Sequence, residues 1–335
     1  MVVKTGSRRS SAMRWTLLPL AIVLLILPQL IGIDYYLHVA IVSLVFIILA
    51  VSLDLLVGYC GLLSLGHTAF FAFGAYAAAL LYLHLNAPLW ITLFASGAFA
   101  ALIAWFLGLL VLGVRGHRFV ITTIVFAEIG RLIAYNWTDV THGQVGLPGI
   151  RPPVFSIPGL VEIDFASRAA YYYLALAITA VCVIAMWRIA HSPIGWRMVA
   201  LRENERLTEA SGIDTRRIAT TAFVVSAFFA GVAGSLYAHY TGFVSPDLFY
   251  FTYTTTMLIM VFLGGKGTIV GPIVGAVLFT ILPEALRVAA DFRLMIFSAI
   301  LLALVVFAPE GLAGLFNRLT ARRRGLVMQP SSAVK

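Results

Sequence analysis

The chain is built from long apolar stretches separated by short polar links. Apolar runs of about 18 residues or more are typical of membrane-spanning helices, because lipid offers no partner to backbone N–H and C=O groups. The pattern predicts ten spans. They cover about 15–33, 37–57, 66–85, 90–112, 119–136, 170–190, 218–240, 250–264, 269–286 and 293–309. The eighth span is short, so a re-entrant or broken segment is an alternative there.

Composition excludes a soluble globular protein. Hydrophobic residues make up 61% and charged residues 11% of the 335 positions, whereas soluble domains carry roughly 25% charged residues. A transmembrane β-barrel would instead show alternating segments of about ten residues. We therefore expect an all-α fold, a polytopic transmembrane helical bundle of about ten spans. Cys60 and Cys182 are isolated, so they predict neither a disulfide framework nor a metal site.

The N-terminal segment combines basic residues with an apolar run, as a signal peptide does. The run is long and no small-x-small cleavage site follows it, so we interpret it as a retained first span. This gives three parts: an N-terminal tail (1–14), a transmembrane domain (15–312) and a basic C-terminal tail (313–335).

Basic residues indicate the orientation, because cytoplasmic loops are enriched in Lys and Arg. With ten spans, both termini lie on one side together with the loops near 115–118 and 191–217 and the link at Lys266, and most of the 23 basic residues fall there. We expect that side to be cytoplasmic. The net charge of +9 is then mainly a topology signal, and no nucleic-acid partner is needed to explain it.

The longest predicted external connection, 137–168, divides the spans into two groups of five. An odd number of spans in each group would give the halves opposite orientation, as in transporters built from inverted repeats. The similarity between "GLLSLGHTAFFAFGA" and "GGKGTIVGPIVGA" is weak. The sequence thus leaves two inverted five-span halves as one possibility.

Small and polar residues are concentrated in "GYCGLLSLGHTAFFAFGAY", from Gly58 to Tyr76. Small residues let membrane helices approach closely, so helix packing is one interpretation. Alternatively, the segment from Gly61 to Gly66 interrupts a helix, and the freed N-terminus faces an anionic substrate group. On that interpretation the candidates for a substrate pathway are Ser64, Gly66, His67 and Thr68.

Three ionisable residues lie in or near predicted spans, and such residues are functional candidates. Glu128 and Arg131 are three residues apart, so they share a helix face and could pair. They join the candidates for the substrate pathway, although a neutralised structural pair is the favoured interpretation. Asp54 is near the cytoplasmic end of its span, where we expect it to reach water. A proton-driven pump is not indicated, because no series of carboxylates and histidines follows.

The chain contains no catalytic motif of the H-E-x-x-H or G-x-S-x-G kind, and no clustered metal ligands. "LGGKGTIVGPIVGA" fails as a P-loop, because Gly267 follows Lys266 and Met260 stands where the first glycine belongs. We expect a tight turn there, with Lys266 at the cytoplasmic surface. The chain is therefore not an enzyme, and we expect it to bind no cofactor or metal.

The charged segment 192–217 is the exception in this apolar chain. Ser192 is a suitable N-cap, Pro193 fits the first helical position and Gly212 suits the C-terminal end. We expect one amphipathic helical element between them, with Trp196, Val199, Leu207 and Ala210 near one face. An interfacial helix is an alternative, but a docking helix for a cytoplasmic partner fits its acidic residues better.

Six stretches carry a family resemblance. "GYCGLLSLGHTAFFAFGAY", "FAEIGR", "GLPGI", "SPIGWRMVALRENERLTEASGID", "FFAGVAGSLYA" and "GGKGTIVGPIVGA" occur in this order across about 35–315. Together they resemble the permease subunits of ATP-binding-cassette importers for branched-chain amino acids. In such a permease an Asn would be expected where Asp54 stands.

The resemblance implies a bacterial inner-membrane importer with four kinds of component. This chain would pair with a second, homologous permease subunit, two cytoplasmic ATPase subunits that bind ATP and Mg²⁺, and an external solute-binding protein. The E-A-A-type loop that contacts the ATPase would be Glu209–Ala210–Ser211–Gly212, although its glycine follows sooner than in most importers. The implied coupling residues are Trp196, Arg197, Arg202, Glu203, Arg206, Glu209, Ala210 and Gly212. Binding-protein docking falls on Thr141, Gly143, Gly146, Leu147 and Gly149.

Two alternatives remain open from the sequence. The solute could be urea or a short-chain amide, because closely similar permeases serve such importers. The chain could also be a stand-alone secondary transporter or channel, which would work without ATPase subunits.

Overall fold

The computed structural model describes residues 28–29, 34–111, 116–157, 161–285 and 311–312. Almost all of the predicted first span and all of the tenth, 293–309, lie outside this described part. Within it, the chain is a multi-pass helical membrane protein.

Six of the described helices are long and apolar enough to cross a membrane. They are α2 (Asp34–Asp54, extended by the π-helix Leu55–Tyr59), α3 (His67–Leu85), α4 (Leu89–Val111), α5 (His117–Asn136), α7 (Arg168–Ala190) and α10 (Thr215–Thr241). Two further apolar helices are shorter, α11 (Phe251–Gly264) and α12 (Val270–Ala285). The expected count of about ten spans is not confirmed, because the eighth and ninth predictions correspond to these shorter helices and the first and tenth lie almost wholly outside the described residues.

The ends of these helices follow local sequence rules. Ser167 and Asp214 cap α7 and α10, each with a side-chain oxygen that accepts from a backbone N–H of the first turn. Asn86 and Gly242 follow α3 and α10 in the left-handed conformation, which ends a helix.

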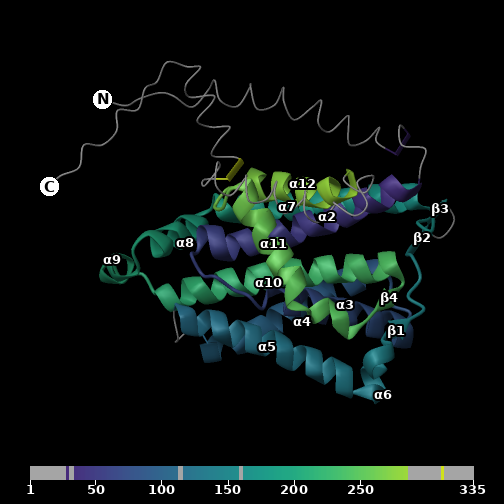
Figure 1. Cartoon of the computed structure of the whole chain (residues 1–335), viewed down its shortest axis with the longest axis horizontal. Coiled ribbons are helices and arrows are strands. Elements are labelled where there is room, and N and C mark those ends of the chain that lie inside the picture. The colour runs from purple at the N-terminus through teal and green to yellow at the C-terminus, as the bar shows by residue number, and fades with distance from the viewer. Residues whose placement is uncertain (1–27, 30–33, 112–115, 158–160, 286–310, 313–335) are drawn as a thin grey trace.

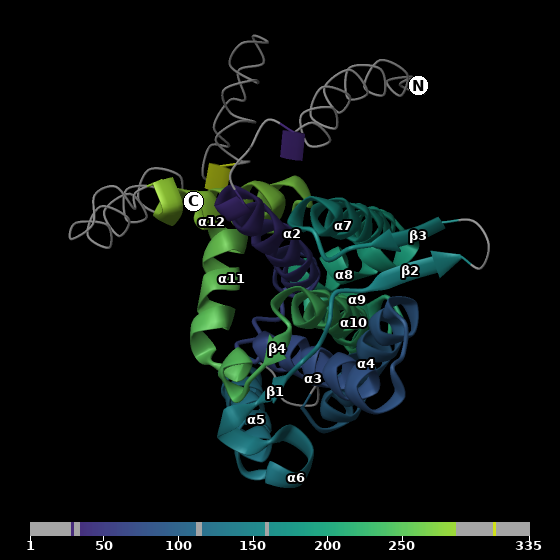
Figure 2. The same ribbon diagram turned by 90° about the vertical axis from the view of Figure 1, so that its right-hand side faces the viewer.

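The long helices run roughly along the long axis of the molecule, whereas α11 crosses the bundle obliquely from α12 toward α5 (Figures 1 and 2). Two short helices, α8 (Pro193–Glu203) and α9 (Glu205–Ala210), lie at one end of the bundle, and short strands lie at the other (Figure 1). The core is formed by α2 and α10, which are the most deeply buried spans. α10 packs against α2, α3 and α4.

Close contact between α3 and α10 depends on glycine. A Cβ atom on Gly74 would overlap the backbone of Gly231, and one on Gly234 would overlap the carbonyl of Phe71. Because apolar side chains gain little by leaving lipid for a helix interface, close backbone packing is a main source of association between membrane helices. The motif interpreted as a helix-packing face is confirmed at Gly74.

The connection 137–168 is more ordered than a loop, and its short strands add to an otherwise all-α fold. It contains α6 (Thr138–Thr141), the 3₁₀ turn Gly143–Val145 and three strands, β1 (Leu147–Pro148), β2 (Val154–Ile157) and β3 (Val161–Asp164). β2 and β3 form an antiparallel hairpin in which Val154 faces Asp164. β1 pairs antiparallel with β4 (Phe243–Val244), which follows α10 and precedes the 3₁₀ turn Pro246–Phe249. This pairing joins the two halves of the chain.

Substituting Gly74→Ala tests the α3–α10 contact. In a helix interior this change normally stabilises by about 0.5–1 kcal/mol. Here the new methyl meets the Gly231 backbone, and overpacking of this kind costs about 1–3 kcal/mol. We expect a net loss of thermal stability for the purified protein in detergent. Gly97→Ala is the control, because its nearest neighbours are the movable side chains of Phe228 and Val232. Equal effects of the two changes would contradict this account.

Candidate functional site

The helix interruption predicted between Gly61 and Gly66 is confirmed. α2 continues as a π-helix through Tyr59, the chain is non-helical over 60–66, and α3 begins at His67. Gly61 has φ +78°, a conformation open to glycine without penalty. Gly66 lies so close to the Thr123 carbonyl that a Cβ atom would overlap it. The break is thus packed directly against α5.

Two threonines from other helices satisfy the backbone of the break. Thr123 on α5 accepts a hydrogen bond from the Leu65 N–H at 3.1 Å, and Thr254 on α11 accepts from the Thr68 N–H at 3.2 Å. The Thr68 hydroxyl donates to the Leu248 carbonyl at 2.7 Å. The N-terminus of α3 is therefore occupied by the protein's own oxygens, and in this conformation the Thr68 amide is not free for an anionic substrate.

His67 lies in a wholly buried polar cluster beside the break. Its Nε2 is 3.0 Å from the Ser52 hydroxyl, and the Ser226 hydroxyl donates to the Ser52 carbonyl. Two further buried atoms, His67 Nδ1 and Ser64 Oγ, have no hydrogen-bond partner among the described residues. Ser64, His67 and Thr68 are three of the four residues predicted for the substrate pathway in this motif. Their polar side chains are thus all buried in the interior, at or beside the break.

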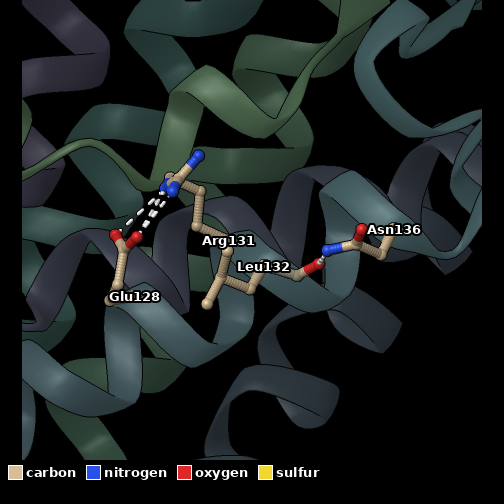
Figure 3. A network of polar contacts seen from close by, with 4 residues as sticks. All are labelled: Glu128, Arg131, Leu132 and Asn136. Atoms are coloured by element: carbon tan, nitrogen blue, oxygen red, sulfur yellow. Dashed lines mark hydrogen bonds and ion pairs between the residues drawn. The ribbon is translucent and has the colours of Figure 1, made fainter.

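Glu128 and Arg131 form the predicted ion pair on α5. Arg131 Nε lies 3.1 and 3.0 Å from the two carboxylate oxygens of Glu128, and Nη2 is 2.5 Å from Oε1 (Figure 3). The Arg131 guanidinium also lies 5.7 Å from the centre of the Tyr250 ring. The Glu128 side chain is 52% exposed, and α5 is the least buried of the six long spans. The pair therefore lies on the outer surface of this chain.

The charged segment forms two helices instead of the one predicted. Ser192 caps α8 as expected, accepting from the Ile194 N–H at 3.2 Å, and Pro193 is the first helical residue. Asn204 then adopts an extended backbone, with φ −159°, and its side chain caps α9 by accepting from the Leu207 N–H at 3.0 Å. An asparagine cap offers the backbone an alternative to continued helix, which explains the break. Gly212 has φ +79° after α9, as predicted.

Of the predicted apolar face, Val199 packs partly buried against the core, whereas Trp196, Leu207 and Ala210 are exposed. α8 buries Gly195, Met198 and Leu201, whereas Trp196 is 69% exposed and Leu207 on α9 is 65% exposed. Arg197, Arg206, Ala210 and Gly212 are exposed as well, and so are Arg202, Glu203 and Glu209. The segment thus presents large apolar side chains (Ile194, Trp196 and Leu207) and several arginines at the end of the bundle.

Arg202 points toward the helix break. Its Nη1 donates to the Gly58 carbonyl at 2.5 Å, while Nη2 pairs with Glu203 at 2.6 Å. Glu209 accepts from the Thr215 hydroxyl at 2.7 Å, which ties α9 to the start of α10. These three candidates therefore hold the segment to the bundle or to each other.

Asp54 differs from its prediction. It does not reach water: its side chain is wholly buried, and Oδ1 accepts from the Gly267 N–H at 2.8 Å. Gly267 belongs to the turn between α11 and α12, which was predicted as a tight turn, and Lys266 is exposed there as expected.

The docking candidates at the opposite end mainly shape their loop. The Thr141 hydroxyl contacts the Ala134 and Trp137 carbonyls at 2.6 and 2.7 Å, and Leu147 is buried in the β1–β4 pair. Gly143, Gly146 and Gly149 all have positive φ angles. The exposed large apolar side chains nearby include Trp137 and Val145, at 54% and 73%. Docking at this loop stays a prediction.

Residues 35–309 match a family described as "Branched-chain amino acid transport system / permease component". The chain belongs to this family. It is 33% identical over 293 residues to the high-affinity branched-chain amino acid transport system permease protein LivM of Escherichia coli K12, covering 82% of this chain and 69% of that protein.

Two more distant relatives are permeases as well. The chain is 25% identical over 285 residues to LivH of Salmonella typhimurium, a branched-chain amino acid permease, covering 80% of this chain and 90% of that protein. It is also 25% identical over 304 residues to the ribose import permease protein RbsC of Haemophilus influenzae, covering 87% and 90%. No solved structure matches the permease.

Sequence reasoning missed the threonines that complete the break of this permease. Thr254 is followed by Thr255 and Thr256, whose hydroxyls donate to carbonyls of their own helix. Nothing in the three-residue run distinguishes Thr254, because its role depends on where α11 crosses α3.

Thr254→Val should therefore destabilise the permease, since it leaves the buried Thr68 N–H without its acceptor. A buried donor left unsatisfied costs about 1–3 kcal/mol. The measurement is thermal unfolding of the purified protein in detergent. Thr255→Val and Thr256→Val are matched controls that should change stability little; a control as destabilised as Thr254→Val would argue against this role.

Proposed function

We propose that this chain is the membrane-spanning permease subunit of an ATP-binding-cassette importer that translocates branched-chain or similar apolar amino acids. The family match over 35–309, together with 33% identity to LivM, carries the proposal. An external solute-binding protein would hand over the solute and supply most of the selectivity.

The chain would act within a larger assembly in a bacterial inner membrane, with both termini cytoplasmic. A second, homologous permease subunit would complete the pathway, and two cytoplasmic ATPase subunits would bind ATP and Mg²⁺. The turn that superficially resembles a P-loop supports this division of labour, because Gly267 uses its backbone N–H to bind Asp54 of the same chain. In this proposal the permease itself binds no nucleotide.

The α8–α9 segment would contact the ATPase subunits. Trp196 and Leu207 are exposed apolar side chains on a polar surface, which is the usual form of an interface anchor. Arg197 and Arg206 would surround them with positive charge. The segment contacts α7, α10 and the π-helix, so a displacement of the segment would also move these parts of the bundle.

The exposed face of α5 would line the pathway or meet the second permease subunit. Charged residues in membrane segments avoid lipid and turn toward protein or water. The Glu128–Arg131 pair lies near the middle of α5 and is partly exposed, so in the assembly it would face either another protein surface or water in the pathway. An amino acid in its zwitterionic form carries both charges that such a pair could bind.

The alternatives have weaker support. No observation on this chain favours urea or an amide, and both LivM and LivH carry a branched-chain amino acid name. A stand-alone secondary transporter would take up solute in proteoliposomes with an ion gradient and no ATP. Uptake by the lone chain under those conditions would overturn the importer proposal.

Trp196→Ala and Leu207→Ala test the ATPase contact. We expect each to reduce the amount of ATPase subunit that co-purifies with the permease by about tenfold, equivalent to about 1.4 kcal/mol. The readout is the subunit ratio after affinity purification. Trp137→Ala, at the opposite end of the bundle, should leave the ratio unchanged; an equal loss there would indicate general destabilisation.

Neutralising the α5 pair tests the pathway. Arg131→Gln and Glu128→Gln should each lower ATP-dependent amino-acid uptake at least tenfold. The double variant has no unpaired charge, so it should assemble at the normal level yet remain deficient in uptake. Normal uptake by the double variant would assign the pair a structural role only.

A further inference from the structure

Arg202 connects the cytoplasmic segment to the last turn before the helix break. Its Nη1 donates to the Gly58 carbonyl of the π-helix at 2.5 Å, and its Nε and Nη2 bond Glu203 Oε1 at 3.1 and 2.6 Å. Among the charged coupling candidates, Arg202 thus contacts the segment that leads into the break.

Glycines make room for this side chain. Gly61 has a φ angle of +78°, and a Cβ atom on it would lie 2.8 Å from Arg202 Cγ. Gly267 has a φ angle of +74°, and a Cβ atom on it would lie 2.9 Å from Arg202 Nη1. A cavity of about 250 Å³ adjoins the side chain, lined in part by Arg202, Gly61 and Asn204. The guanidinium is held by two contacts but has space to move.

Asp54 supplies a second acceptor at the same place. Its Oδ1 accepts from the Gly267 N–H at 2.8 Å, and the Thr268 N–H also acts on this carboxyl group, whereas the buried Oδ2 has no donor at hydrogen-bond geometry among the described residues. Arg202 and Lys266 are the cations whose charges act on this carboxylate. A buried carboxylate oxygen without a donor is unfavourable, and a guanidinium is the donor that best matches a carboxylate.

We propose that Arg202 is a positioning residue with two acceptors, the Gly58 carbonyl in this conformation and Asp54 Oδ2 in a second conformation reached when the ATPase subunits displace α8. This rests on the proposed function of α8–α9 as the coupling segment. In the second conformation the Gly58 carbonyl is released, so the turn before residues 60–66 is free to move. Displacement of α8 then reaches the break and the start of α3.

The test uses the complete transporter, with its ATPase subunits and binding protein, in proteoliposomes. The readout is the number of amino-acid molecules transported for each ATP hydrolysed. Arg202→Gln and Asp54→Asn should each lower this ratio at least fivefold, and the double variant should be no worse than the worse single variant, because the residues act as one unit. Asp54→Asn keeps the side-chain volume and an oxygen for the Gly267 N–H. Arg202→Lys keeps the charge, so its ratio of amino acid transported to ATP hydrolysed should lie between those of Arg202→Gln and the wild type.

Arg206→Gln is the matched control, because Arg206 is an exposed arginine on the adjacent helix. Its effect should multiply with that of Asp54→Asn. Multiplying effects of Arg202→Gln and Asp54→Asn, or no recovery with Arg202→Lys, would overturn the Arg202 proposal. Loss of ATPase subunits from Arg202→Gln would also overturn it, since Arg202 would then be a direct ATPase contact. A wild-type complex without ATP-dependent uptake would overturn the proposed function and this inference together.

Discussion

The break between α2 and α3 is the constraint on which the arrangement of the bundle depends. A chain that leaves helical geometry inside a membrane protein must still satisfy its backbone N–H groups, because lipid cannot do so. Here Thr123 and Thr254 accept from the Leu65 and Thr68 N–H groups, and the Leu248 carbonyl accepts from the Thr68 hydroxyl. α5, α11 and the 3₁₀ turn are therefore held against the start of α3. The oblique course of α11 (Figure 2) brings Thr254 to this point.

The remainder of the bundle divides into a tightly packed core and a sparsely packed side. α10 packs against α2, α3 and α4, and glycines allow its backbone to approach that of α3. In contrast, α5 buries one narrow face and leaves the Glu128–Arg131 pair partly exposed. A rigid core with an exposed, charged helix at its side fits a subunit that completes its pathway with another chain, as proposed above.

The α8–α9 segment joins the packed core to the surface proposed above for the ATPase subunits. Its apolar anchors point away from the bundle, while Arg202 and Glu209 hold it to the π-helix and to α10. Such a segment has one surface for a partner and a second for the membrane domain. In the proposed mechanism, force from the ATPase subunits enters through the first surface and reaches the break through the second.

The sequence by itself determined the membrane class and the positions of the long spans, because these depend on composition and local periodicity. It placed Glu128 and Arg131 where they could pair, and it offered the interruption at Gly61–Gly66 as one of two interpretations of the same motif. It also identified the family through ordered motifs. Only the tertiary structure decided which threonine completes the break, that Asp54 is buried against Gly267, and that Arg202 points inward while Trp196 points outward. Each of these depends on where segments that are far apart in the chain cross. Until that crossing is known, the same residue type could be buried or exposed and could have any of several partners.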